Sequence, residues 1–213
     1  MRAPALQMLH SRSSSLAVRC RLPSLGALRQ LSTQCPAARR AEMLRVDHAG
    51  ELGAVEIYRG QAWVLRGTSL EPTLRAMQAG EEAHLTRLNS LLGERRVRPS
   101  LLAPLWRAAG FALGVATGLL GRQMAMAATV SVETSISKHY NSQVRELLEE
   151  GGRGGAQRGD EELVAVFSKH RDEEVEHHDT AVALGAKDAP AFQAQDAAIQ
   201  LGCAAAIAVA SKV

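Results

Sequence analysis

The stretches Glu81-Glu82-Ala83-His84 and Glu174-Val175-Glu176-His177 decide the fold predicted for this chain, because each places a Glu three residues before a His. On a helix, residues three apart lie on one face, so a carboxylate oxygen and an imidazole nitrogen can reach one point. Two such pairs, each joined by a Glu from another helix, form the metal site of di-iron and di-manganese carboxylate bundles. The two stretches therefore predict an all-α, ferritin-like four-helix bundle around two metal ions.

The alternative interpretation is that both stretches are solvated, charged helix surface, as Glu-rich helices usually are. It accounts for most of the run 171–179, which is charged almost throughout. It does not account for a second pair in a matching place. The register of the pairs also predicts that Glu82 and Glu173 face away from the metal ions.

Two further glutamates, Glu51 and Glu133, are candidates for the missing carboxylates. Each is followed seven residues later by one of the chain's two tyrosines, Tyr58 and Tyr140. Seven residues make about two helical turns, so each Tyr is expected on the face of its own Glu. A duplicated helical hairpin explains this repeat. The predicted metal ligands are Glu51, Glu81, His84, Glu133, Glu174 and His177.

These ligand types suit a pair of iron ions that activates O₂. Carboxylates are hard ligands that stabilise ferric iron and can bridge, and one imidazole per iron leaves coordination positions open. The sequence leaves open whether the bridging pair is Glu81 with Glu174 or Glu51 with Glu133. Asp47 and His48 precede Glu51 by about one turn and are candidates to orient it; the alternative for His48 is partial exposure.

Composition favours helices, because aromatic residues make up only 3% of the 213 residues and long alternating strand patterns are absent from the sequence. Helices that carry ligands are expected over 41–65, 71–92, 122–150 and 160–184. A Gly-rich stretch, 151–160, is expected to be a loop. Two additional apolar helices are expected over 99–121 and 189–211.

The segment 99–121 contains a charge-free run from 108 to 121, which at fourteen residues is shorter than the ~20 needed to span a bilayer. The pattern fits a helix that lies in a membrane interface, with Trp106 and Arg107 at headgroup level. The alternative is an ordinary buried helix. Gly110, Gly114 and Gly118 recur every four residues, which permits close contact with another helix.

Residues 1–40 contain seven Arg, six Ser and no Asp, Glu or Lys, which is typical of an organellar transit peptide. The alternative is a basic tail that binds nucleic acid. Without this segment the chain keeps all 22 acidic residues against 25 less seven basic ones, a net charge near −4. That charge argues against a nucleic-acid partner. The predicted domains are therefore a transit peptide, 1–40, and a di-iron domain, 41–213.

Several motifs together resemble the mitochondrial demethoxyubiquinone hydroxylase family. They are Arg-Val-Asp-His-Ala-Gly-Glu-Leu-Gly-Ala over 45–54, the two Glu-x-x-His pairs, His139-Tyr140-Asn141, and Arg-Asp-Glu-Glu-Val-Glu-His-His-Asp over 171–179. The resemblance runs from about residue 41 to the C-terminus. It implies the same six metal ligands, two iron ions, and a role for His139 and Tyr140 in electron entry.

The resemblance also implies a reaction and a place for it. The expected reaction is hydroxylation of the ring of demethoxyubiquinone or its quinol, the penultimate step of ubiquinone synthesis, with O₂ and electrons from NADH or NADPH. The expected location is the matrix side of the mitochondrial inner membrane, with peripheral attachment. Expected partners are a lipid-binding protein and a larger ubiquinone-synthesis complex, and a homo-oligomer stays open. The alternatives are an iron-storage or scaffold bundle and a ubiquinone-dependent oxidase of the same fold.

Overall fold

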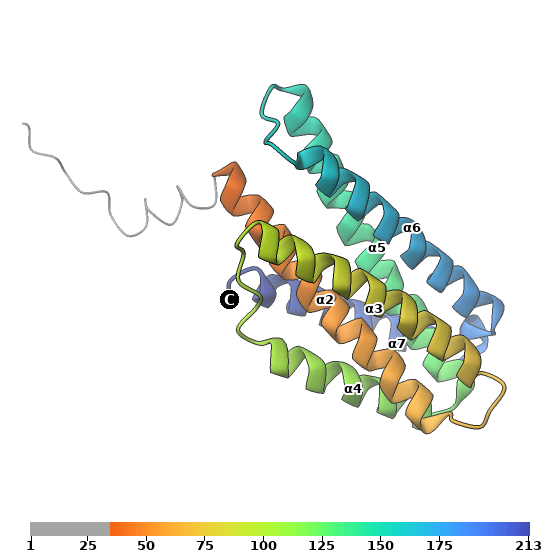
Figure 1. The fold of residues 1–213 in the computed structure, drawn as a ribbon. Coiled ribbons are helices and arrows are strands. Elements are labelled where there is room, and N and C mark those ends of the chain that lie inside the picture. The colour runs from red at the N-terminus through yellow and green to blue at the C-terminus, as the bar shows by residue number, and fades with distance from the viewer. Residues whose placement is uncertain (1–34) are drawn as a thin grey trace, which may run out of the picture.

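The structure is a computed structural model that describes residues 35–213; the first 34 residues of the predicted transit peptide lie outside the described part. The described chain is all-helical and contains no strand, which confirms the all-α part of the prediction. Six α-helices and one short 3₁₀ helix, Ala186–Asp188, follow one another (Figure 1). The α-helices are α2 (Pro36–Val64), α3 (Glu71–Glu94), α4 (Ala103–Leu119), α5 (Arg122–Gly152), α6 (Asp160–Ala183) and α7 (Phe192–Ala210).

All six expected helices are present, and the largest difference is at the start of the first. α2 begins at Pro36 instead of residue 41. Proline suits the first turn of a helix, where its missing N–H has no helical acceptor. Arg40, buried in the added turn, donates to Asp160 at 2.9 and 3.1 Å. Residues 36–40 therefore belong to the folded helix.

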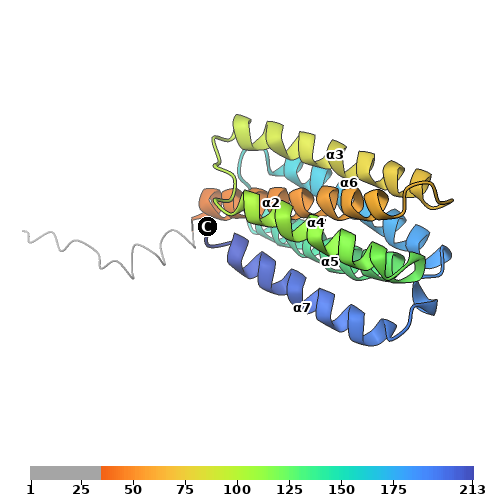
Figure 2. The ribbon, with the colours of Figure 1, turned by 90° about the horizontal axis from the view of Figure 1, so that it is seen from below.

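The helices form two neighbouring hairpins, each with one further helix packed against it. α2 packs against α3 and α4, and α5 packs against α6 and α7. Figure 2 shows α3 and α7 on opposite sides of α2 and α5. The short connections make the two helices of each hairpin antiparallel. Gly121 adopts a φ of 101° in the sharp turn from α4 to α5, a conformation that favours glycine.

Glycines let α2 and α4 approach closely, as the four-residue repeat predicts. A Cβ built on Gly60 of α2 would lie 2.6 Å from the carbonyl oxygen of Phe111 and 2.8 Å from the amide nitrogen of Val115. On α4, Gly110 and Gly114 lie directly against the backbone of α2. No side chain fits between the two helices at these positions.

Two apolar clusters flank the middle of the bundle, and each contains one tyrosine. The first consists of Met43, Leu44, Leu88, Leu91, Leu92, Tyr140, Val144, Leu147, Leu163 and Phe167. The second consists of Tyr58, Ala62, Leu70, Leu74, Met77, Ala125, Met126, Val130, Ala181 and Ala186. The predicted metal ligands come from the same four helices, so apolar packing isolates them from water.

The position of Trp106 differs from the sequence-based expectation for the apolar helix α4. As expected, none of the described helices combines the length and the apolarity that crossing a bilayer requires. Trp106 points inward: its Nε1 donates to Ser100 Oγ at 3.1 Å, and its ring packs against the cluster of Val46 and Ala49. It therefore does not fit the predicted headgroup anchor. The large exposed aromatic residue is instead Trp63 on α2, which is 54% exposed.

Candidate metal centre

The six predicted ligands converge in the middle of the bundle. α2 supplies Glu51, α5 supplies Glu133, and the paired motifs of α3 and α6 supply the other four. The four glutamates are fully buried, and the exposed fractions of the His84 and His177 side chains are 3% and 15%. Long helices hold these side chains without any loop, which favours a rigid site.

The donors form two overlapping groups whose ligand atoms lie within 4.8 Å of one another. Position A consists of Glu51, Glu81, His84 and Glu174, and position B consists of Glu81, Glu133, Glu174 and His177. Glu81 and Glu174 belong to both. Of the two bridging pairs that the sequence leaves open, this geometry favours Glu81 with Glu174.

One ring nitrogen of each histidine faces the carboxylates. His84 Nδ1 lies 3.2 Å from Glu174 Oε1, 3.5 Å from Glu81 Oε2 and 3.6 Å from Glu51 Oε2. His177 Nδ1 lies 2.8 Å from Glu81 Oε1 and 3.6 Å from Glu174 Oε2. Both imidazoles therefore present Nδ1 to the space between the glutamates.

The donor set fits two divalent cations. Eight inward atoms have no hydrogen-bond partner, even where a histidine nitrogen lies close to a carboxylate. They are Glu51 Oε2, both carboxylate oxygens of Glu81 and of Glu174, Glu133 Oε2, His84 Nδ1 and His177 Nδ1. Each unsatisfied buried group costs about 1–3 kcal/mol, and charged groups cost more. Two divalent cations would satisfy these atoms and balance the charge of four carboxylates.

The pKa values of the candidate ligands without metal also indicate a site for cations. Burial raises the pKa of Glu51 well above its usual range, and burial together with the charges of Glu174 and Glu81 does the same to the pKa of Glu133. Burial alone would lower the pKa of His177, but the adjacent carboxylates of Glu174 and Glu81 raise it to about 9. Without metal ions, protons must therefore supply the positive charge that the carboxylates demand.

The two tyrosines hold the outer glutamates, but in a crossed arrangement. Tyr58 donates its hydroxyl to Glu133 Oε1 at 2.5 Å, and Tyr140 donates to Glu51 Oε1. Each tyrosine thus binds the glutamate of the other hairpin. Both bonds fix a carboxylate whose other oxygen points inward.

Two side chains at the centre were not predicted as part of it. Glu173 belongs to neither metal position, as predicted, but its Oε2 lies 2.7 Å from His84 Nε2, behind that ligand. His170 stacks on the His84 ring with centroids 4.1 Å apart, and its Nδ1 lies 3.2 Å from the Tyr140 hydroxyl. The position of His170, four residues before Glu174, places it on the ligand face and could have indicated it.

His139 lies outside both metal positions. Its Nε2 is 3.2 Å from Asp47 Oδ1, an oxygen that also accepts a 2.8 Å hydrogen bond from Gln143 Nε2. Asp47 therefore orients His139 rather than Glu51. His48, the other candidate to orient Glu51, instead pairs with Asn89 of α3 at 3.1 Å.

A narrow, apolar cavity of about 30 Å³ lies between α2, α5 and α7. Its lining residues are Val46, Asp47, Gly50, Glu51, Ile136, His139, Tyr140 and Ile207. The cavity thus joins a candidate ligand and both residues of the His-Tyr pair to the side of the bundle that α7 covers.

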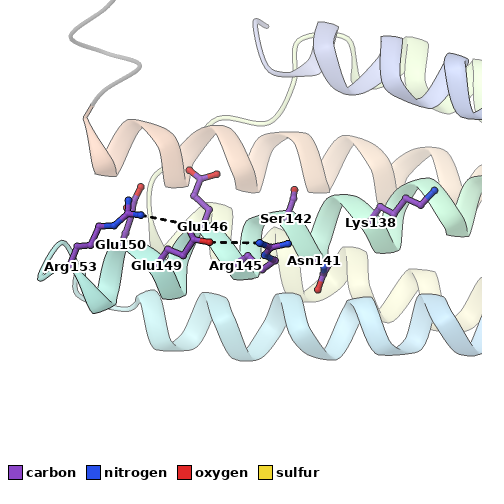
Figure 3. A pocket seen from close by; sticks show the side chains of 8 residues that line it. All are labelled: Lys138, Asn141, Ser142, Arg145, Glu146, Glu149, Glu150 and Arg153. Carbon is purple, nitrogen blue, oxygen red and sulfur yellow. Dashed lines mark ion pairs between the residues drawn. The ribbon is translucent and has the colours of Figure 1, made fainter.

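A larger groove of about 480 Å³ follows the outer face of α5 and contains none of the candidate ligands (Figure 3). Its lining residues are Lys138, Asn141, Ser142, Arg145, Glu146, Glu149, Glu150 and Arg153. Arg145 and Arg153 pair with Glu149 at 4.0 and 3.8 Å, at exposed positions. Such pairs contribute about 0–1 kcal/mol, so we interpret the groove as ordinary charged surface.

Comparison with known proteins gives consistent similarities. Residues 38–210, which include all six candidate ligands, match the family model described as "Ubiquinone biosynthesis protein COQ7". The NADPH-dependent 3-demethoxyubiquinone 3-hydroxylase, mitochondrial, of Rattus norvegicus is 50% identical over 166 residues, 78% of this chain and 74% of the rat protein. The protein of the same name from Homo sapiens is 47% identical over 171 residues, 80% and 76% of the two chains. The 3-demethoxyubiquinol 3-hydroxylase of Rhodospirillum rubrum is 46% identical over 181 residues, 84% and 80% of the two chains.

Proposed function

Because the chain belongs to the family described as ubiquinone biosynthesis protein COQ7, we propose that it hydroxylates the ring of demethoxyubiquinone or its quinol as a di-iron monooxygenase. This is the penultimate step of ubiquinone synthesis, with O₂ as the oxygen source and NADPH or NADH as the electron donor. The observation that carries the proposal is the buried donor set of four carboxylates and two imidazoles, with Glu81 and Glu174 shared between two positions.

We assign the six candidate ligands to two iron ions. Carboxylates and imidazoles suit iron, and six ligands on two ions leave coordination positions free. Bound there, the iron pair would supply the reduction and activation of O₂. Glu81 and Glu174 would bridge, while Glu51 and Glu133 would each bind one ion, held by Tyr140 and Tyr58.

The protein's own side chains prepare the site for this chemistry. The two apolar clusters on either side exclude water, which protects a reactive centre from side reactions. His139 and Tyr140 line the small cavity beside Glu51, between the metal centre and the side of the bundle that α7 covers. This position supports a role for the pair in electron entry, with Asp47 orienting His139.

The proposed substrate carries a polyprenyl tail, so it must be taken from a bilayer. Large apolar side chains are exposed on both additional helices, including Leu105 and Leu119 of α4 and Leu201 of α7. Next to α4, Trp63 is contacted by Arg66, whose guanidinium carbon lies 5.5 Å from the ring centroid. Exposed leucines beside Trp and Arg are typical of a membrane interface. We assign peripheral attachment to the matrix side of the mitochondrial inner membrane.

The remaining assignments are a targeting segment and partners. We place the end of a mitochondrial transit peptide before Pro36, because Arg39 and Arg40 form ion pairs with Glu146 and Asp160 inside the folded domain. A lipid-binding protein and a larger ubiquinone-synthesis complex would present the substrate. The exposed leucines are also compatible with a homo-oligomer. They do not suit an iron-storage cage, which needs a soluble outer surface.

The test is a reaction of purified protein, reconstituted with Fe²⁺, on demethoxyubiquinone with NADPH under ¹⁸O₂. We expect a hydroxylated quinone that carries one ¹⁸O, measured by mass spectrometry. A ubiquinone-dependent oxidase would consume O₂ and leave the ring mass unchanged. Cells that lack the protein should accumulate demethoxyubiquinone, and accumulation of a different quinone would contradict the proposed substrate.

A further inference from the structure

The two Glu-x-x-His motifs present the same donors in different surroundings. When the motifs are aligned on Glu81 and Glu174, the residue before the glutamate is Gly80 in α3 but Glu173 in α6. The motifs can thus be compared position by position, and the differences fall next to the two ligand histidines.

His84 of position A is held at both ring nitrogens. Its Nδ1 faces the ligand carboxylates, and its Nε2 donates to Glu173 Oε2 at 2.7 Å. Lys169 Nζ holds the same carboxylate at 2.8 and 3.0 Å. A carboxylate behind a ligand histidine fixes the ring and makes the other nitrogen a stronger donor. His84 is therefore oriented for metal before any metal binds.

His177 of position B has no such support among the described residues. Its Nε2 lies beside Gly80, where an added Cβ would come within 3.2 Å, and it has no counterpart of Glu173 behind it. Its side chain is also more exposed than that of His84, 15% against 3%. His177 must therefore lose more rotational freedom than His84 when it binds a metal ion.

A second difference adds a donor to position A alone. His170 lies four residues before Glu174, and it forms a third possible metal-binding group with Glu51 and His84. The matching residue of α3, four before Glu81, is Met77, which is buried in an apolar cluster. Position A thus has an imidazole within reach where position B has apolar packing.

We propose that the two metal positions are inequivalent, that position A binds its ion first and more tightly, and that Glu173 is the positioning residue for His84. The inference rests on the proposed two-metal function and deepens it. It predicts a chain that holds one ion firmly and the second more loosely.

The test is an anaerobic titration of metal-free protein with Co²⁺, followed by visible absorption and independent of turnover. The unaltered protein should bind two equivalents in two phases. Glu173→Ala should weaken the first phase about 10–100-fold and leave the second unchanged. Glu173→Gln keeps an oxygen acceptor and should restore part of the loss. The control is Glu82→Ala, which removes an exposed glutamate beside Glu81 and should change neither phase.

Two further variants identify the positions. His177→Ala should retain one equivalent with the tight affinity, and His84→Ala should retain one with the weak affinity. Because Glu173 is 35% exposed, its variants should keep the fold, which far-ultraviolet circular dichroism checks. A single phase of two equal equivalents overturns the inequivalence, and an unchanged first phase in Glu173→Ala overturns the positioning role of Glu173. Either result leaves the two-metal centre. Failure to bind any Co²⁺ overturns both.

Discussion

At the scale of single residues, the centre depends on two glutamates that serve both metal positions. Glu81 and Glu174 are each 0% exposed, and each offers both oxygens to the interior. The outer glutamates differ, since Glu51 belongs only to position A and Glu133 only to position B. Removal of a shared ligand must therefore have a different effect from removal of an outer one.

We expect Glu174→Ala to lose both metal ions, because Glu174 belongs to both positions. Glu133→Ala should retain about one ion per chain, because Glu133 belongs only to position B. Metal content per chain, measured by mass spectrometry of the purified protein, distinguishes the two results. Circular dichroism should show unchanged helix content. Equal metal loss in both variants would contradict the shared role of Glu174.

At the scale of helices, the joint between α2 and α4 depends on the absence of side chains. Gly114 lies against the backbone of Ile57, and Gly60 lies against that of Phe111. Backbone atoms cannot move aside as the end of a flexible side chain can, so an added methyl group must push the helices apart. The joint also links the helix of Glu51 to the apolar surface of α4.

Gly114→Ala should therefore lower the free energy of unfolding, by about 1–3 kcal/mol as is typical of overpacking. The matched control is Gly202→Ala in α7, where nothing lies within 4 Å of the added Cβ. Alanine favours helix, so the control should be neutral or stabilising by up to about 1 kcal/mol. Urea unfolding of both variants measures the difference. Equal stability of the two would show that α4 adjusts its position freely.

The pair of Arg40 and Asp160 joins the first turn of α2 to the first turn of α6. Arg40 lowers the pKa of Asp160, so the pair stabilises the fold above the ordinary aspartate pKa of 3.8 and loses this effect as the pH falls through the lower folded value. Asp160→Asn should lower the free energy of unfolding by about 1.5–3 kcal/mol at pH 7, as is typical of the loss of a hydrogen bond to a charged group.

Denaturant unfolding at several pH values tests this pair. The free energy of unfolding of Asp160→Asn should differ most from that of the unaltered protein at neutral pH, and this difference should shrink below pH 3.8. A protein that begins at residue 41 lacks Arg40 and also Arg39, which pairs with Glu146, so it should lose at least as much stability at neutral pH. A pH-independent difference would mean that the ion pair is not its cause.

At the scale of the whole molecule, the exposed leucines beside the α4–α5 turn suit membrane attachment. Leu119 and Leu120 are 70% and 66% exposed. Burial of a leucine in lipid contributes up to about 1.5–3 kcal/mol. The double variant Leu119→Glu, Leu120→Glu should therefore no longer float with vesicles that contain anionic lipid, while its metal content stays normal.

The control for membrane attachment is Leu148→Glu, another exposed leucine, at 57%. Leu148 lies far from the α4–α5 turn, because it is 26 residues from Arg122, the first residue of α5. At 1.5 Å per residue, this separation is about 39 Å. This variant should float like the unaltered protein. Flotation of the double variant would place the membrane-binding surface elsewhere.

Sequence spacing predicted the helices and the convergence of the six donors, because Glu-x-x-His at three-residue spacing admits one helical face. It could not predict Glu173 as a partner of His84, since that contact crosses from α6 to α3 and depends on how the hairpins are packed. The inward turn of Trp106 was missed for the same reason: its neighbours Val46 and Ala49 come from another helix. Periodicity describes one helix, whereas these contacts join two.

The distribution of donors along the chain has a consequence for when the centre can be assembled. Both positions need Glu174 of α6 together with Glu81 of α3, so no partial product of synthesis that ends before residue 174 contains either position. A chain that crosses a membrane unfolded would likewise cross it empty. Metal binding at either position must therefore wait until residue 174 has been synthesised and α6 has packed beside α3.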